Sequence, residues 1–134
     1  RTADAQTRGS DVLVLAEKQI IARSEATVYG EPIDVSRFAD LMIETAVGAE
    51  TLDTSATVTV KYHTANDPDL PQANWAELDA NAVAQGASMP AVDRIRVGFG
   101  QTVPLGRYIR WSLTFSAATA SQSVKFQSIA VGHE

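Results

Sequence analysis

The residues of this chain that could do chemistry are few, and the histidines come first. His63 and His133 are its only histidines, and there is no cysteine. A thiolate nucleophile, a disulfide and a cysteine-based zinc site are therefore excluded. A Ser-His-Asp triad would need one of the two histidines, but no Gly-x-Ser-x-Gly motif is present, and His133 is the penultimate residue. We expect His63 at the surface, where a strand meets a polar loop. The sequence predicts no catalytic residue and no enzyme.

Carboxylates occur in two arrangements that could carry a site. Asp67 and Asp69, with asparagines nearby, provide oxygen ligands of the kind that Ca²⁺ prefers. The full calcium-loop pattern is absent, so we interpret this segment as a turn whose side chains bond the local backbone. Glu77 and Asp79 would share one face of a strand at about 6–7 Å, a spacing that glycosidases use. Two acids on a solvent-facing strand are the commoner reading, and we expect neither a metal site nor a cofactor.

Four arginines on or beside predicted strands are candidates for binding a partner. A guanidinium group forms paired hydrogen bonds with a carboxylate, so these side chains could bind acidic residues of a neighbouring subunit. Outward-facing arginines also keep a sheet soluble and protect its edges. The sequence leaves both interpretations open for Arg94, Arg96, Arg107 and Arg110.

The composition excludes several kinds of partner. The net charge is −5, from 16 acidic and 11 basic side chains, which argues against a nucleic-acid surface. No apolar run is long enough to span a membrane. The glycines do not follow a phosphate-loop pattern, and we expect no small-molecule substrate.

The chain begins at Arg1 without an initiator methionine or a signal-peptide pattern, so we expect it to be processed or incomplete.

The elements that would position these residues are β-strands. The predicted central strand follows a Pro-Gly turn at residues 104–106. The chain alternates again at residues 38–47, 56–63 and 94–99, most cleanly at 56–63. The side chains expected to face inward include Leu41, Ile43, Thr45, Val47, Val58, Val60, Tyr62, Ile95, Val97, Ile109, Trp111, Leu113 and Phe115.

The last predicted strand, residues 122–131, switches faces. Val124 and Phe126 share one side, whereas Ile129 and Val131 share the other, which indicates a bulge or a strand that is apolar on both sides. Strands recurring roughly every ten residues are typical of an all-β protein. We predict a two-sheet antiparallel sandwich, jelly-roll-like, with about eight strands.

Before this sandwich, we predict an N-terminal arm. Residues 1–15 are expected to be flexible or to dock on a partner, and residues 16–134 to form the single domain. For residues 11–23 a strand is favoured, and a helix is the alternative. The arm residues that we expect to contact a partner are Arg1, Arg8, Val12 and Leu13.

Three segments carry a resemblance to a known family. They are Ala-Thr-Val-Thr-Val-Lys-Tyr-His-Thr at 56–64, Trp-Ala-Glu-Leu at 75–78 and Pro-Leu-Gly-Arg-Tyr-Ile-Arg-Trp at 104–111. Over residues 33–132 the chain resembles the β-sandwich decoration, or cement, proteins of tailed-bacteriophage capsids. The resemblance implies a virion structural protein made in the host cytoplasm. It would stabilise the outer capsid surface by binding neighbouring major capsid subunits, and would self-associate as a dimer or trimer.

Carbohydrate-binding or host-surface-binding sandwich modules share the Arg-Tyr-x-Arg strand and remain the alternative. In such modules exposed aromatic side chains stack on sugar rings. Tyr29, Tyr62 and Trp75 are the candidates here, although we expect Tyr62 and Trp75 to lie in the core. A buried Trp75 would argue against this alternative.

Overall fold

The fold is built from β-strands, as predicted. The computed structural model describes residues 10–52, 56–85, 91–98, 103–116 and 121–134. Within that part of the chain, no helix is long and apolar enough to cross a membrane. The elements are β1 (Ser10–Ala22), β2 (Thr27–Tyr29), β3 (Ile33–Asp34), β4 (Asp40–Thr51), β5 (Thr57–Ala65), the 3₁₀ turn η1 (Gln72–Asn74), β6 (Ala76–Gln85), β7 (Ala91–Gly98), β8 (Tyr108–Phe115) and β9 (Ser123–His133).

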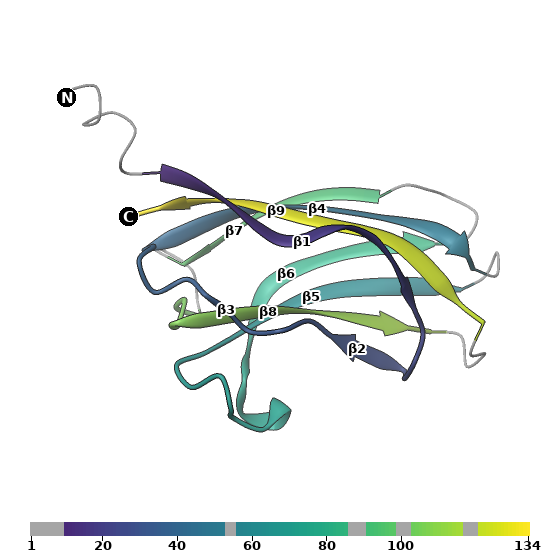
Figure 1. Cartoon of the computed structure of the whole chain (residues 1–134), viewed down its shortest axis with the longest axis horizontal. Helices are drawn as coiled ribbons and strands as arrows, with labels where there is room; N and C mark the ends of the chain where they lie inside the picture. Colours follow the sequence, from purple (N-terminus) through teal and green to yellow (C-terminus); the bar gives the residue numbers. More distant parts are fainter. Residues whose placement is uncertain (1–9, 53–55, 86–90, 99–102, 117–120) are drawn as a thin grey trace.

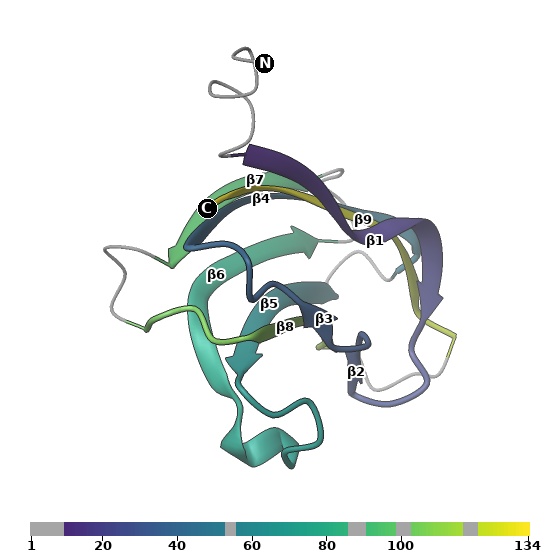
Figure 2. The same cartoon turned by 60° about the vertical axis from the view of Figure 1, so that its left-hand side comes forward.

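The strands form two antiparallel sheets that pack face to face (Figures 1 and 2). Sheet one has the order β1-β9-β4-β7, and sheet two has the order β2-β8-β5-β6, with β3 also paired to β8. Because β2 and β3 pair with successive stretches of β8, they are two halves of one strand that is interrupted around Pro32. Counted so, each sheet has four strands, and the jelly-roll prediction is confirmed.

The core is filled by the side chains that the period-two pattern placed inward. Those of β4, β5 and β8 are buried, and Trp111 of sheet two packs on Phe126 of sheet one with 4.9 Å between ring centroids. Trp111 also lies against the backbone at Gly30, where an added Cβ would come within 2.3 Å of its ring. This close approach explains a glycine at that position.

One polar link crosses the core between the sheets. The Tyr62 hydroxyl on β5 lies 2.5 Å from Thr45 Oγ1 on β4 and 2.5 Å from Ser128 Oγ on β9. All three side chains are buried. A buried hydroxyl is stable only when it is hydrogen-bonded, so these groups satisfy one another and help to fix how the two sheets sit.

The predicted boundary of the N-terminal arm is wrong for residues 10–15. These residues lie in β1 and pair with β9, beginning at Ser10 opposite His133, and the helix alternative is wrong as well. The ladder shifts register between Val14 and Ala16 and again between Ala16 and Gln19. Such irregularities interrupt the alternation that marks a strand in a sequence. Residues 1–9, with Arg1 and Arg8, lie outside the described residues.

The face switch in the last strand also has a clear outcome. The β4–β9 ladder runs without a shift from Asp40 opposite His133 to Ala49 opposite Val124, so β9 has no bulge there. Ser128 and Ala130 face the core, and Ile129 and Val131 face outward. Strand β9 is therefore apolar on both sides.

Candidate partner interface

The outer face of sheet one exposes apolar side chains. The register places Val12 beside Val131 and Val131 beside Met42, and in the next row Val14 lies beside Ile129. The exposed fractions lie between 37% and 63% for Val12, Val14, Met42 and Val131. Ile129 is half-buried. We call these five neighbouring residues the apolar patch.

Exposed apolar side chains are concentrated on this sheet. Among the described residues, seven large hydrophobic side chains are exposed, and six of them belong to sheet one. Ile20 and Val92 extend the face beyond the apolar patch, and Tyr29 is the one that belongs to sheet two. Monomeric proteins rarely expose a contiguous apolar surface of this kind without a function for it.

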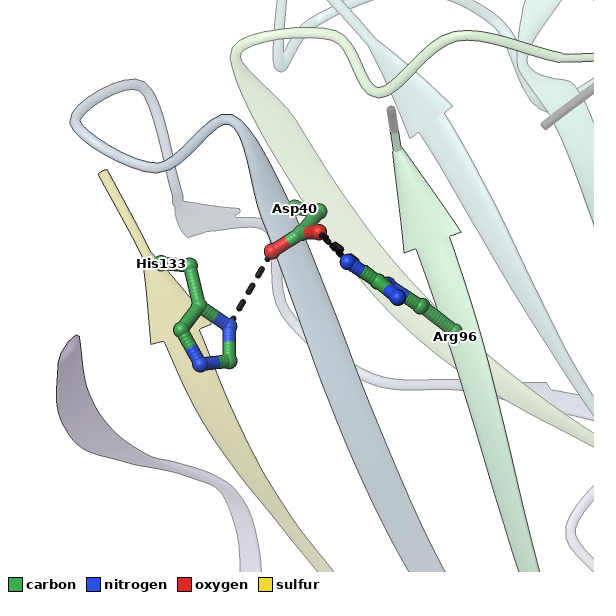
Figure 3. Close-up of polar contacts among 3 residues, drawn as sticks. All are labelled: Asp40, Arg96 and His133. Atoms are coloured by element: carbon green, nitrogen blue, oxygen red, sulfur yellow. Dashed lines mark hydrogen bonds and ion pairs between the residues drawn. The ribbon is translucent and has the colours of Figure 1, made fainter. Parts of the chain in front are cut away.

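Ion pairs border the apolar patch on the β7 side. Arg96 lies next to Met42 in the ladder, and its guanidinium group is 2.8 Å from Asp40 Oδ2. Asp40 is only 5% exposed, because His133 lies on its other side with Nδ1 3.1 Å from Oδ1 (Figure 3). In the adjacent row Arg94 Nε is 2.6 Å from Glu44 Oε2. Arg94 and Arg96 thus bind carboxylates of their own chain, which was the interaction predicted for a neighbour.

The outer face of sheet two is mostly polar over β2, β8 and β5, the strands of this sheet whose side chains are described along their length. Thr27, Thr114 and Thr59 stand side by side across β2, β8 and β5, and the hydroxyls of Thr27 and Thr114 are 3.2 Å apart. Lys61 forms an ion pair with Glu77 at 3.0 Å. This is the composition expected of a sheet face in contact with water. The two outer faces therefore differ in kind.

A cluster around Arg110 covers one end of the sheet-two face. The guanidinium carbon lies 4.8 Å from the ring centroid of Tyr29 and 4.4 Å from that of Trp75, and the group donates a hydrogen bond to Gln72. Burial lowers the pKa of Arg110, although Tyr29 and Glu31 act in the opposite direction. Arg110 holds the loop before β6 against the sheet, and we assign it this structural role.

The aromatic candidates for sugar stacking are mostly inaccessible. Trp75 is 6% exposed, and its indole Nε1 donates to the backbone oxygen of Leu70 at 3.0 Å. Tyr62 is 2% exposed within the core. Neither ring can stack on a sugar in this structure, and Tyr29, at 41% exposed, is the one candidate left at the surface.

His63 is buried, although the sequence suggested a surface position. Its Nε2 is 2.9 Å from Ser112 Oγ, and the ring of Tyr29 lies edge-on at 6.1 Å between centroids. Burial lowers the pKa of His63, and the nearby Glu77 carboxylate acts in the opposite direction. These contacts come from β2 and β8, the neighbouring strands, which the strand pattern of β5 alone could not reveal.

The remaining predicted partner residues do not join the apolar patch. Arg107 lies at the start of β8, with its Nε 3.7 Å from Asp34 Oδ2 on sheet two. Leu13 is half-buried and packs against the core. The four arginines therefore lie on both sheets and do not form one surface.

The acidic loop behaves as a turn in this structure. The Asp67 carboxylate accepts a hydrogen bond from the backbone N–H of Asp69 at 2.9 Å, and Asn66 Oδ1 accepts one from the backbone N–H of Arg107 at 3.0 Å. Within the described residues, no three His, Cys, Asp or Glu side chains gather to hold a metal ion. The Asp67 hydrogen bond stabilises the turn itself, and the Asn66 hydrogen bond holds the loop against the segment that leads into β8.

The fold is similar to that of chains in solved virus structures. Infectious bursal disease virus strain Gt matches with a TM-score of 0.59 and 11% identity over 92% of this chain and 33% of that chain. The VP2 subviral particle of this virus gives a TM-score of 0.58 and 10% identity over 92% and 32%. Its T=1 particles give 0.54 and 12% over 92% and 31%. This chain thus spans about a third of the chains that it matches.

No protein-family model matches the sequence of this chain, and no curated protein is detectably similar to it. With identities of 10–12%, the structural matches show a shared fold. Any function must therefore be argued from the surface of the chain itself.

Proposed function

We propose that this chain is a structural protein of a virus particle, and that its apolar patch packs against a neighbouring subunit. The observation that carries the proposal is the difference between the two outer faces. A two-sheet sandwich free in water is expected to present polar residues on both faces, as β2, β8 and β5 of sheet two do. An apolar outer face on sheet one is the composition of a surface that another protein covers.

The fold is compatible with this role. Jelly rolls build viral capsid domains, and they also build lectins and cupins. The similarity to virus-particle chains favours the first of these uses. Within the described residues no three His, Cys, Asp or Glu side chains gather to hold a metal ion, and the proposal itself requires only contact between subunits.

A finer form of the proposal follows from the resemblance in sequence. The chain would be made in the host cytoplasm and would decorate the outer surface of a tailed-phage capsid. There it would stabilise the shell by binding neighbouring major capsid subunits. The segments at 56–64, 75–78 and 104–111 support this form, and the structure places all three in or beside sheet two.

Virus particles that lack this chain provide the test. Its gene would be deleted from the virus that encodes it, and purified chain would be added back to the particles. We expect saturable binding, with a fixed number of copies per particle, and a higher temperature for genome release. Particles that already carry the chain are the control and should bind no more. Failure of the wild-type chain to bind deleted particles would remove the proposal.

Carbohydrate binding is not favoured by the described residues. Two of its three aromatic candidates are buried, and Arg110 occupies one face of Tyr29. A glycan array probed with the purified chain would test it directly, and selective binding that is lost in Tyr29→Ala would revive this alternative.

A further inference from the structure

We infer that the occupant of the apolar patch is a second copy of this chain, with sheet one of each copy packed face to face. This inference names the partner at the site used in the proposed function. It depends on that proposal only in using the same patch.

The charged side chains beside the apolar patch form ion pairs within their own chain. Arg94 pairs with Glu44, and Asp40 lies between Arg96 and His133 (Figure 3). A partner selected by charge needs unpaired charges to recognise, and these side chains offer none. The surface that fits this face is apolar, with its own charges already neutralised. The outer face of sheet one meets that description.

The distribution of charge also permits self-association here. Two arginines and two carboxylates beside the patch balance, whereas the whole chain carries a net charge of −5. The acidic excess therefore lies elsewhere on the molecule. Two copies that approach through sheet one bring together the neutral part of an acidic protein, where like-charge repulsion is weakest.

The position of the apolar patch suits a two-fold contact. Val131 lies on β9, between Val12 on the edge strand β1 and Met42 on β4. A two-fold axis in the interface near Val131 would set each patch against its copy. The arginine–carboxylate pairs beside β7 would then form a polar rim around an apolar centre. Aligned sheets pack in this way at about 10 Å separation.

The size of the apolar patch sets the expected strength. Five apolar side chains with a polar rim fit the lower end of specific interfaces, about 1,200 Å² in total. Interfaces of this size are typical of weak or transient contacts, so we expect a dimer that forms only at high protein concentration. A dimer of this strength would form on a crowded particle surface and separate on dilution.

The first experiment measures the mass of the purified chain by sedimentation velocity across a concentration series. We expect the mass to rise from the 14.3 kDa of one chain to twice that value. Val131→Asp should keep the chain monomeric and weaken association by at least about a hundredfold, because a carboxylate would be buried without a partner. Thr59→Asp, on the outer face of sheet two, is the matched control and should dimerise like the wild type. Circular dichroism and melting temperature establish that both variants are folded.

A second measurement remains informative if Val131→Asp fails to fold. The chain has no cysteine, so Val131→Cys introduces a single thiol near the proposed axis. Mild oxidation should join two copies in Val131→Cys and not in Thr59→Cys. A wild-type chain that stays monomeric at the highest concentration, or a dimer joined through Thr59→Cys, would overturn the inference. A chain that dimerises through the patch yet fails to bind particles would keep this inference and remove the proposed function.

Discussion

Replacing Tyr62 with phenylalanine removes a single oxygen atom at the point where the two sheets are joined. The buried hydroxyls of Thr45 and Ser128, each 2.5 Å from the tyrosine oxygen, then lose this partner. A hydrogen bond contributes about 1 kcal/mol net, and a buried group left unsatisfied costs about 1–3 kcal/mol. Threonine and serine hydroxyls can turn toward nearby backbone carbonyls, which limits the loss. We therefore expect Tyr62→Phe to lower the free energy of unfolding by about 2–4 kcal/mol.

Urea denaturation followed by tryptophan fluorescence measures this loss. Tyr29→Phe is the matched control, because its hydroxyl lies on a partly exposed residue, and we expect a change within about 0.5 kcal/mol. The triple variant with Thr45→Val and Ser128→Ala removes the polar partners too, and it should recover most of the stability lost by Tyr62→Phe. The reasoning is refuted if Tyr62→Phe costs no more than Tyr29→Phe, or if the triple variant is less stable than the single one.

Three further predictions concern single side chains. The pKa of His63 is lowered below 6.5 in the folded chain, so the unfolded chain binds a proton that the folded chain does not. Stability should therefore fall as the pH drops below that value, and urea midpoints of His63→Gln should show a weaker acid dependence. Gly30→Ala would place a Cβ 2.3 Å from the Trp111 ring, and it should cost about 1–3 kcal/mol by thermal melting; an unchanged melting temperature would contradict this. Asp40→Asn should cost about 1–2 kcal/mol in urea, because Arg96 loses its charge-assisted hydrogen bonds; no loss at low salt would contradict it.

The strand content and the core were readable from the sequence because both follow from local alternation. Trp111 and Leu113, like Val58 and Val60, repeat at period two, and a strand places such residues on one face whatever its neighbours are. The sequence also predicts that Ile129 and Val131 lie on the face of β9 opposite Val124 and Phe126. That this face belongs to a larger apolar surface follows only from the pairing of β9 with β1 and β4.

The features that sequence reasoning missed depend on pairing across the chain. Arg94 and Arg110 look alike in the sequence, but strand order places them on different sheets. Trp75 is buried with its indole bonded to the loop at Leu70, and His63 is buried beside Tyr29 and Ser112 of neighbouring strands. No periodic pattern reports these contacts. The ion pair of Asp40 with Arg96 joins residues that only the β4–β7 register brings together, and no signal in the sequence marks it.

The two register shifts in β1 have a consequence for handling this protein in quantity. A long straight strand at the border of a sheet is a template on which copy after copy can add, and fibres grow that way. Here the regular stretch of that border ends at Val14, and the irregular part continues to Gln19. Open-ended growth along this border is thereby discouraged. This edge therefore favours contacts that close on themselves over fibre growth.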